Sequence, residues 1–230
     1  MHDGDAPVFH LDDRRLAALD EAESLIFHSD FCPYLDLKEM LTNGSKLVKR
    51  RFRILFTYFY GLNTGGLTDK FKDRFFGILF SGNVIVDGQP AYAEILNELS
   101  EIERKQGDRA LPLSFVSKLV AMRDESRPIY DRHVLAFFGK RHPASSTEKA
   151  RRIAWYEDFL GLVRRSYAAW AGDPRFAVIL KRFASRDEGL AKCHVVRQVD
   201  FLVWKVGNQK LLEVSSGAST EQAANDRGLQ

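Results

Sequence analysis

Hydrophobic positions along the chain follow the spacing of helices rather than that of strands. The clearest stripe alternates steps of three and four residues, which places its members on one helix face. It consists of Ile153, Tyr156, Leu160, Val163, Tyr167 and Trp170. A second stripe follows Pro90, a residue type favoured at helix starts, and consists of Tyr92, Ile95, Leu96, Leu99 and Ile102. Both stripes predict amphipathic helices.

The same periodicity predicts an all-α fold for the rest of the chain. Further helices are expected at residues 12–28, 46–60, 67–80, 115–124, 129–138, 174–184 and 187–206. Only residues 83–87 favour an extended segment, which is too short to found a sheet. We expect a single helical domain over residues 1–214, with two lobes around a cleft. Residues 215–230 lack the apolar side chains that offset ordering entropy, and we expect them to be disordered.

Composition narrows the classes of function. The 230 residues, 45% of them hydrophobic, suffice for a substantial core. Cys32 and Cys193 are the only cysteines and lie far apart, so neither a disulfide framework nor a cysteine-ligated cluster is expected. No apolar run reaches the roughly 18 residues of a membrane span, and residues 1–10 lack the apolar stretch of a secretory signal. We therefore expect a cytoplasmic protein with no cofactor, no metal and no membrane partner.

Basic residues gather in two patches although the net charge is only +3. The first patch contains no acidic residue and consists of Lys46, Lys49, Arg50, Arg51 and Arg53. The second consists of Lys140, Arg141, His142, Lys149, Arg151, Arg152, Arg164 and Arg165. Such patches suit the neutralisation of DNA phosphates, and the alternative interpretation is that they are solvated helix faces.

The segment from Leu111 to Val134 carries the strongest motif. It opens with Leu111-Pro112, reaches Lys118, and closes with Pro128-Ile129-Tyr130-Asp131-Arg132-His133-Val134. This order resembles the helix-hairpin-helix base-excision DNA glycosylases. Their signature joins a Leu-Pro start, a hairpin turn, a lysine at the head of the next helix, and Pro-Val-Asp-x-His-Val. The resemblance covers this segment alone.

The resemblance implies roles for individual residues. Lys118 falls where the family places its lysine nucleophile, and Asp131 falls on the catalytic aspartate. Contacts to DNA are expected from Lys46, Lys49, Arg50, Arg51, Ser114, Ser117, Arg132, His133, Lys140 and Arg141. The expected partner is double-stranded DNA with an extruded base, bound by a monomer.

Three features depart from the family pattern. Ser114, Phe115 and Val116 replace the usual Gly-x-Gly of the hairpin, which changes how closely backbone amides approach a phosphate. The interval from Lys118 to Asp131 is shorter than in the family. The cysteine-ligated cluster of one branch is absent, so the cluster-free, 8-oxoguanine-type branch is more similar. A narrower hypothesis is a resemblance to defence-associated bacterial glycosylases that remove hypermodified phage bases such as glucosylated hydroxymethylcytosine, although no residue selects that substrate.

The chemistry of base excision explains why these residue types are suitable. Breaking an N-glycosidic bond develops positive charge on the sugar, which a fixed carboxylate such as Asp131 stabilises. A desolvated lysine such as Lys118 attacks C1′ as an amine and forms a Schiff base. A water molecule as nucleophile is the alternative. Simpler interpretations are that Asp131 caps a helix, that Lys118 is solvated, and that Arg197 and Asp200 form a structural pair.

The leading functional prediction is excision of a damaged or modified DNA base. Two alternatives stay open: a noncatalytic DNA-binding module of the same fold, and a helical protein-interaction domain. Salt-dependent DNA binding is expected of the enzyme and of the noncatalytic module, but not of the protein-interaction domain. Base release distinguishes the enzyme from the noncatalytic module.

Overall fold

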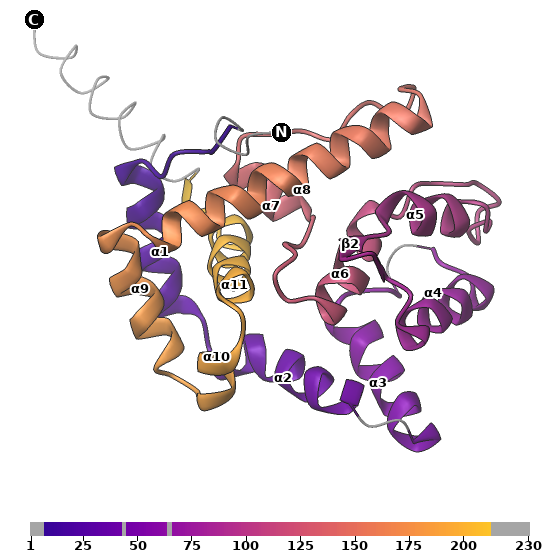
Figure 1. The fold of residues 1–230 in the computed structure, drawn as a ribbon, viewed down its shortest axis with the longest axis horizontal. Coiled ribbons are helices and arrows are strands. Elements are labelled where there is room, and N and C mark those ends of the chain that lie inside the picture. Colours follow the sequence, from indigo (N-terminus) through magenta and orange to yellow (C-terminus); the bar gives the residue numbers. More distant parts are fainter. Residues whose placement is uncertain (1–6, 43–44, 64–65, 213–230) are drawn as a thin grey trace, which may run out of the picture.

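The computed structural model describes residues 7–42, 45–63 and 66–212 (Figure 1). It confirms the all-α class, with 67% helix and 2% strand. None of the described helices is long and apolar enough to cross a membrane. The disorder expected for residues 215–230 concerns residues outside the described ranges.

Helices account for almost all of the regular structure among the described residues. They are α1 (Asp13–Leu25), α2 (His28–Thr42), α3 (Lys46–Phe59), α4 (Asp69–Ser81), α5 (Tyr92–Ser100), α6 (Leu113–Arg123), α7 (Arg132–Phe137), α8 (Lys149–Ala171), α9 (Pro174–Ala184), α10 (Glu188–Lys192) and α11 (Val195–Asn208). A short hairpin joins β1 (Ile85–Val86) to β2 (Gln89–Pro90). Its turn residues Asp87 and Gly88 have φ angles of 49° and 75°, the positive values that a tight hairpin turn requires.

Three helix boundaries differ from the predictions. The helix expected at 12–28 ends at Leu25, and α2 follows as a separate helix that the pattern did not indicate, since it contains Pro33. The helix expected at 187–206 is divided into α10 and α11, because His194 caps the second of them by accepting a hydrogen bond from the Val196 N–H. The helix expected at 129–138 begins only at Arg132, after its capping residue Asp131.

The helices gather in two groups (Figure 1). In the first group, α4 and α5 pack on α6; in the second, α1, α7, α8 and α9 pack on α11. Helix α2 packs on both α3 and α10, so it connects the groups, and their buried apolar residues form one continuous core. The chain leaves the first group at the end of α6 and enters the second through residues 124–131. Lys118 on α6 and Asp131 at the start of α7 lie on either side of this crossing.

Candidate active site

A cleft of about 630 Å³ lies where the two groups of helices meet. Its wall includes Lys118 from α6 and Asp131 from the start of α7. Aromatic side chains from other elements complete it: Tyr58 and Phe59 from the end of α3, and Trp204 from α11. The cleft thus combines ionisable groups, Lys118 and Asp131 among them, with flat apolar surfaces.

The structure brings Lys118 and Asp131 together. The Lys118 Nζ lies 3.9 Å from the Asp131 Oδ2, and it donates a hydrogen bond of 3.0 Å to the Ser114 Oγ. The rings of Tyr60 and Phe115 lie 5.6 Å and 5.7 Å from the same amine. The short sequence interval between the two residues therefore does not prevent them from meeting.

Burial changes the acidity of the lysine. Only 9% of Lys118 is exposed, which contradicts its interpretation as a solvated helix residue. Loss of solvent lowers the pKa of Lys118, while the nearby Asp131 carboxylate acts in the opposite direction. Since burial is the larger effect, the neutral amine is more populated near neutral pH than it would be in water. A neutral amine is the form that attacks carbon.

Asp131 has a second contact that fixes its orientation. Its Oδ1 accepts a hydrogen bond of 2.7 Å from the backbone N–H of His133, so the carboxylate caps α7. The helix-capping interpretation is therefore confirmed. It does not remove the carboxylate from the cleft, because the Oδ2 atom remains directed at Lys118.

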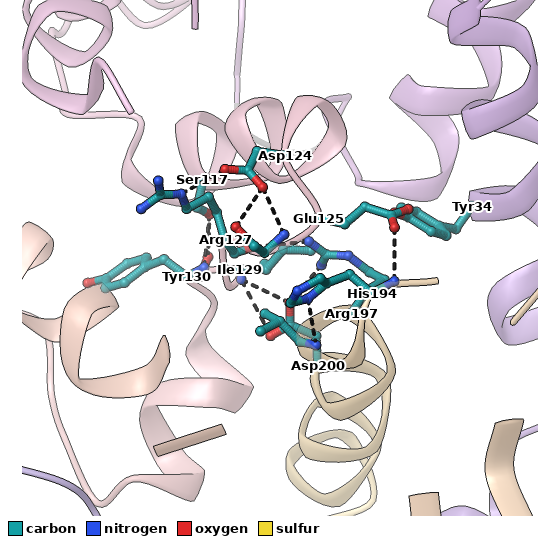
Figure 2. A network of polar contacts seen from close by, with 12 residues as sticks. Tyr34, Ser117, Asp124, Glu125, Arg127, Ile129, Tyr130, His194, Arg197 and Asp200 are labelled. Atoms are coloured by element: carbon teal, nitrogen blue, oxygen red, sulfur yellow. Dashed lines mark hydrogen bonds and ion pairs between the residues drawn. The ribbon is translucent and has the colours of Figure 1, made fainter. Parts of the chain in front are cut away.

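A buried ion pair holds the loop that carries Asp131 (Figure 2). The Arg197 Nη1 lies 2.7 Å from the Asp200 Oδ2, and Asp200 also accepts a hydrogen bond of 3.1 Å from the Ile129 N–H. The Arg197 Nη2 donates to the Arg127 carbonyl at 3.1 Å. This confirms the expected structural pair. Through it, α11 fixes two backbone groups of the loop that precedes Asp131.

Glu125 ties the beginning of the same loop to α2 and to the start of α11 (Figure 2). Its carboxylate accepts hydrogen bonds from the Tyr34 hydroxyl and from the His194 N–H, the latter at 3.0 Å. Lys38 lies 3.3 Å away. Burial raises the pKa of Glu125, but these contacts outweigh it and lower the pKa overall. The loop is thus held at both ends by charged groups.

Ser117 does not belong to a DNA-binding surface, contrary to the expectation. It is fully buried, accepts a hydrogen bond of 2.9 Å from the Tyr130 N–H, and donates one of 2.9 Å to the Ser114 carbonyl. Its hydroxyl joins α6 to the loop before α7. Packing places Ser117 on the inner face of α6, so its side chain is not presented at the surface.

Ser114, Phe115 and Val116 do not form the hairpin turn that the resemblance implies. These residues lie in the first turn of α6, which begins at Leu113, and residues 101–112 separate it from α5. Ser114 serves instead as the hydrogen-bond acceptor for Lys118.

The remaining expected DNA contacts divide into two sets. Arg132 and His133 line the cleft, where the His133 ring lies 5.9 Å from that of Trp204. Lys140 and Arg141 are exposed beyond the end of α7 and do not line it. Sequence reasoning did not assign Trp204 to the site. Trp204 follows Asp200 by four residues, which places both on one face of a helix, and this spacing was the signal that could have assigned Trp204 to the site.

The first basic patch lies on α3, outside the cleft. Among the described residues, Lys46, Lys49, Arg50 and Arg51 form no ion pair, whereas Arg53 pairs with Asp73. All four unpaired side chains are exposed. Their positive charge is therefore available to an anionic partner.

The described residues do not meet the requirements of a metal site. Within residues 7–42, 45–63 and 66–212, no cluster of three or more His, Cys, Asp or Glu side chains could hold a metal ion. Cys32 and Cys193 are free thiols. No family model matches the sequence, and no significant match was found among curated proteins or solved structures.

Proposed function

We propose that this protein is a DNA glycosylase with a helix-hairpin-helix glycosylase-like fold, which excises a damaged or modified base. The observation that carries the proposal is the contact of Lys118 with Asp131, at 3.9 Å, in a cleft lined by aromatic residues. A buried lysine beside a carboxylate supplies a nucleophile and a group that stabilises positive charge on the sugar, the two groups that the covalent route of N-glycosidic cleavage uses. The absence of a hairpin turn at Ser114 to Val116 favours a second candidate, a noncatalytic DNA-binding module.

The proposed reaction begins with the neutral amine of Lys118. Its nitrogen lone pair forms a bond to C1′, the N-glycosidic bond breaks, and the base leaves with that electron pair. Asp131 stabilises the positive charge that develops on the sugar. The bound nitrogen then loses a proton and its lone pair forms the C=N bond of the Schiff base, while the C1′–O4′ bond breaks and O4′ takes up a proton. When water attacks instead of Lys118, Asp131 retains its role and activates the water.

The cleft offers room for an extruded base. Its volume of about 630 Å³ exceeds that of an unmodified base, and Phe59, Tyr58 and Trp204 provide faces for stacking. This capacity is compatible with bulky modified bases as well as with oxidised ones. Repair of the cell's own DNA and removal of hypermodified phage bases are therefore both within the proposal.

Base release is the experiment that tests the proposed function. The full chain is incubated with duplexes that contain oxidised, deaminated, alkylated or glucosylated bases, and free base and abasic sites are measured. We expect release from at least one duplex class. DNA binding without release from any of them would favour the noncatalytic module. Absence of salt-dependent binding would favour the protein-interaction domain.

Neutralising the α3 patch is expected to reduce DNA affinity without changing its sequence dependence. A Lys46→Gln/Arg50→Gln variant removes two unpaired cations, so the slope of log K against log salt should fall by about 1.4 to 1.8. The matched control is Lys105→Gln/Lys181→Gln, which removes the same charge from exposed positions elsewhere that form no ion pair among the described residues. An unchanged slope in the α3 variant would show that the patch is only solvated surface.

A further inference from the structure

A second groove lies along α3, separate from the cleft that contains Lys118. It has a volume of about 540 Å³ and is lined by Lys46, Lys49, Arg50, Arg53, Ile54 and Phe80. Four of these residues are cationic, while Ile54 and Phe80 contribute apolar surface. The groove can therefore contact both an anionic group and apolar atoms of the same ligand.

The cations of the groove are largely uncompensated. Lys46, Lys49 and Arg50 form no ion pair among the described residues. The Lys49 Nζ lies 5.4 Å from the centre of the Phe80 ring, so positive charge stands directly beside an aromatic face. An anionic group bound by these cations would bring its neighbouring atoms onto the apolar surface.

Exposed apolar residues extend this surface towards the cleft. Leu47, Ile54 and Tyr58 are 62%, 65% and 84% exposed, and their spacing of seven and four residues places them on one face of α3. Ile54 lines the groove, and Tyr58 lines the cleft. The face is therefore continuous from the groove to the cleft.

A nucleic-acid strand with unpaired bases matches both properties. Its phosphates pair with cations, and its flat rings stack on apolar and aromatic side chains. In a duplex the ring faces are covered by neighbouring bases, so a duplex would use the cations alone. Lys46 and Tyr58 are twelve residues apart, about 18 Å along the helix, which is long enough for several nucleotides of one strand.

We propose that the α3 groove binds an unpaired DNA strand that flanks the base in the cleft. Lys46, Lys49 and Arg50 neutralise its phosphates, while Ile54, Phe80 and Tyr58 contact its bases. This inference rests on the proposed function in taking DNA as the partner and in placing a base in the cleft. It specifies single-stranded or locally opened DNA as the preferred substrate, where the sequence indicated a duplex with one extruded base.

Fluorescence anisotropy with undamaged probes tests the groove independently of excision. The probes are a thymidine strand of about twelve nucleotides, a duplex of equal length, an abasic strand of equal length, a polyglutamate peptide and anionic phospholipid vesicles. We expect the thymidine strand to bind about tenfold more tightly than each of the others. Equal binding of the duplex or the abasic strand would overturn the proposal, and so would equal binding of the peptide or the vesicles.

A single exposed substitution provides the second measurement. Ile54→Asn should weaken binding of the thymidine strand about tenfold and leave the abasic strand unaffected, because it removes a surface for bases only. The matched control is Val178→Asn on α9, at a residue that is 63% exposed. Unchanged thymidine affinity in Ile54→Asn would also overturn the proposal. Because base release is measured separately on damaged duplexes, this result leaves the proposed glycosylase activity standing.

Discussion

Asp131→Asn should lower the rate of base excision at least about 100-fold while leaving DNA affinity nearly unchanged. The carboxylate faces the Lys118 amine at 3.9 Å, where charge develops in the proposed transition state. Asparagine has nearly the same size and caps helices as well as aspartate does, so the hydrogen bond from the His133 N–H is retained. The substitution therefore removes charge without disturbing the helix. Single-turnover excision and equilibrium DNA binding measure the two effects separately.

The matched control for this experiment is Asp173→Asn. Asp173 caps α9 by accepting a hydrogen bond from the Arg175 N–H, and it lies outside the cleft. The same chemical change there should leave the excision rate intact. Near-normal turnover in Asp131→Asn would show that the carboxylate acts only as a helix cap.

Arg197→Met should lower the free energy of unfolding by about 3–5 kcal/mol, because it leaves Asp200 buried without its partner. Asp200 is 4% exposed, and burial raises its pKa from 3.8 to about 7 although Arg197 opposes the change. Since the folded state holds this proton more tightly than the unfolded state, stability falls as pH rises through the folded pKa. Without Arg197, the pKa of Asp200 in the folded state rises further, so stability continues to fall up to a higher pH. The loss of unfolding free energy caused by Arg197→Met should therefore be larger at pH 8 than at pH 5. Urea unfolding at both pH values provides the measurement.

The double variant Arg197→Met/Asp200→Leu distinguishes two causes of the lost stability: the unpaired charge of Asp200 and the lost packing around Arg197. It removes the unpaired charge as well, so it should recover a large part of the lost stability. Excision should stay impaired in the double variant, because the Ile129 N–H and the Arg127 carbonyl still lose the side chains that hold the loop before Asp131. An equally unstable double variant would mean that packing around Arg197, and not its charge, stabilises the loop.

The parts of the fold that sequence predicted best are those fixed by local periodicity. The stripe from Ile153 to Trp170 is buried along α8, and α3 begins at Lys46 as expected. Helix α2 was missed because Pro33 removes a backbone donor and is unfavourable inside a helix in isolation. Its buried residues Phe31, Tyr34 and Leu37 supply packing that the local pattern does not reveal.

The candidate site was predicted in its residue types and in one of its supports, the Arg197–Asp200 pair, but not in the others. Lys118 and Asp131 were selected by the motif around them, and only the fold brings their side chains to 3.9 Å. Ser117 was misassigned because its exposure depends on how α6 packs against the loop at Tyr130. The hydrogen bond from the Tyr34 hydroxyl to the Glu125 carboxylate joins residues that are distant in sequence, and no local spacing indicates such a contact.

The most direct measurement of the proposed catalytic pair is borohydride trapping on a duplex with a single abasic site. The free aldehyde at C1′ of this probe reacts with an amine without prior base release, so the result does not depend on which base the protein excises. We expect a covalent adduct that maps to Lys118 and is absent in Lys118→Gln. Its rate of formation should rise with pH through the pKa of Lys118, which burial lowers, because the neutral amine is the reactive form.

Lys205→Gln is the matched control, since Lys205 is also buried and lies 2.9 Å from the Asp30 carboxylate. It should form the adduct as the unaltered protein does. Adduct formation in unaltered protein and in Lys205→Gln, but not in Lys118→Gln, is the result that the proposed pair predicts. An adduct that persists in Lys118→Gln, or base release without any adduct, would contradict the assignment of Lys118 as the nucleophile.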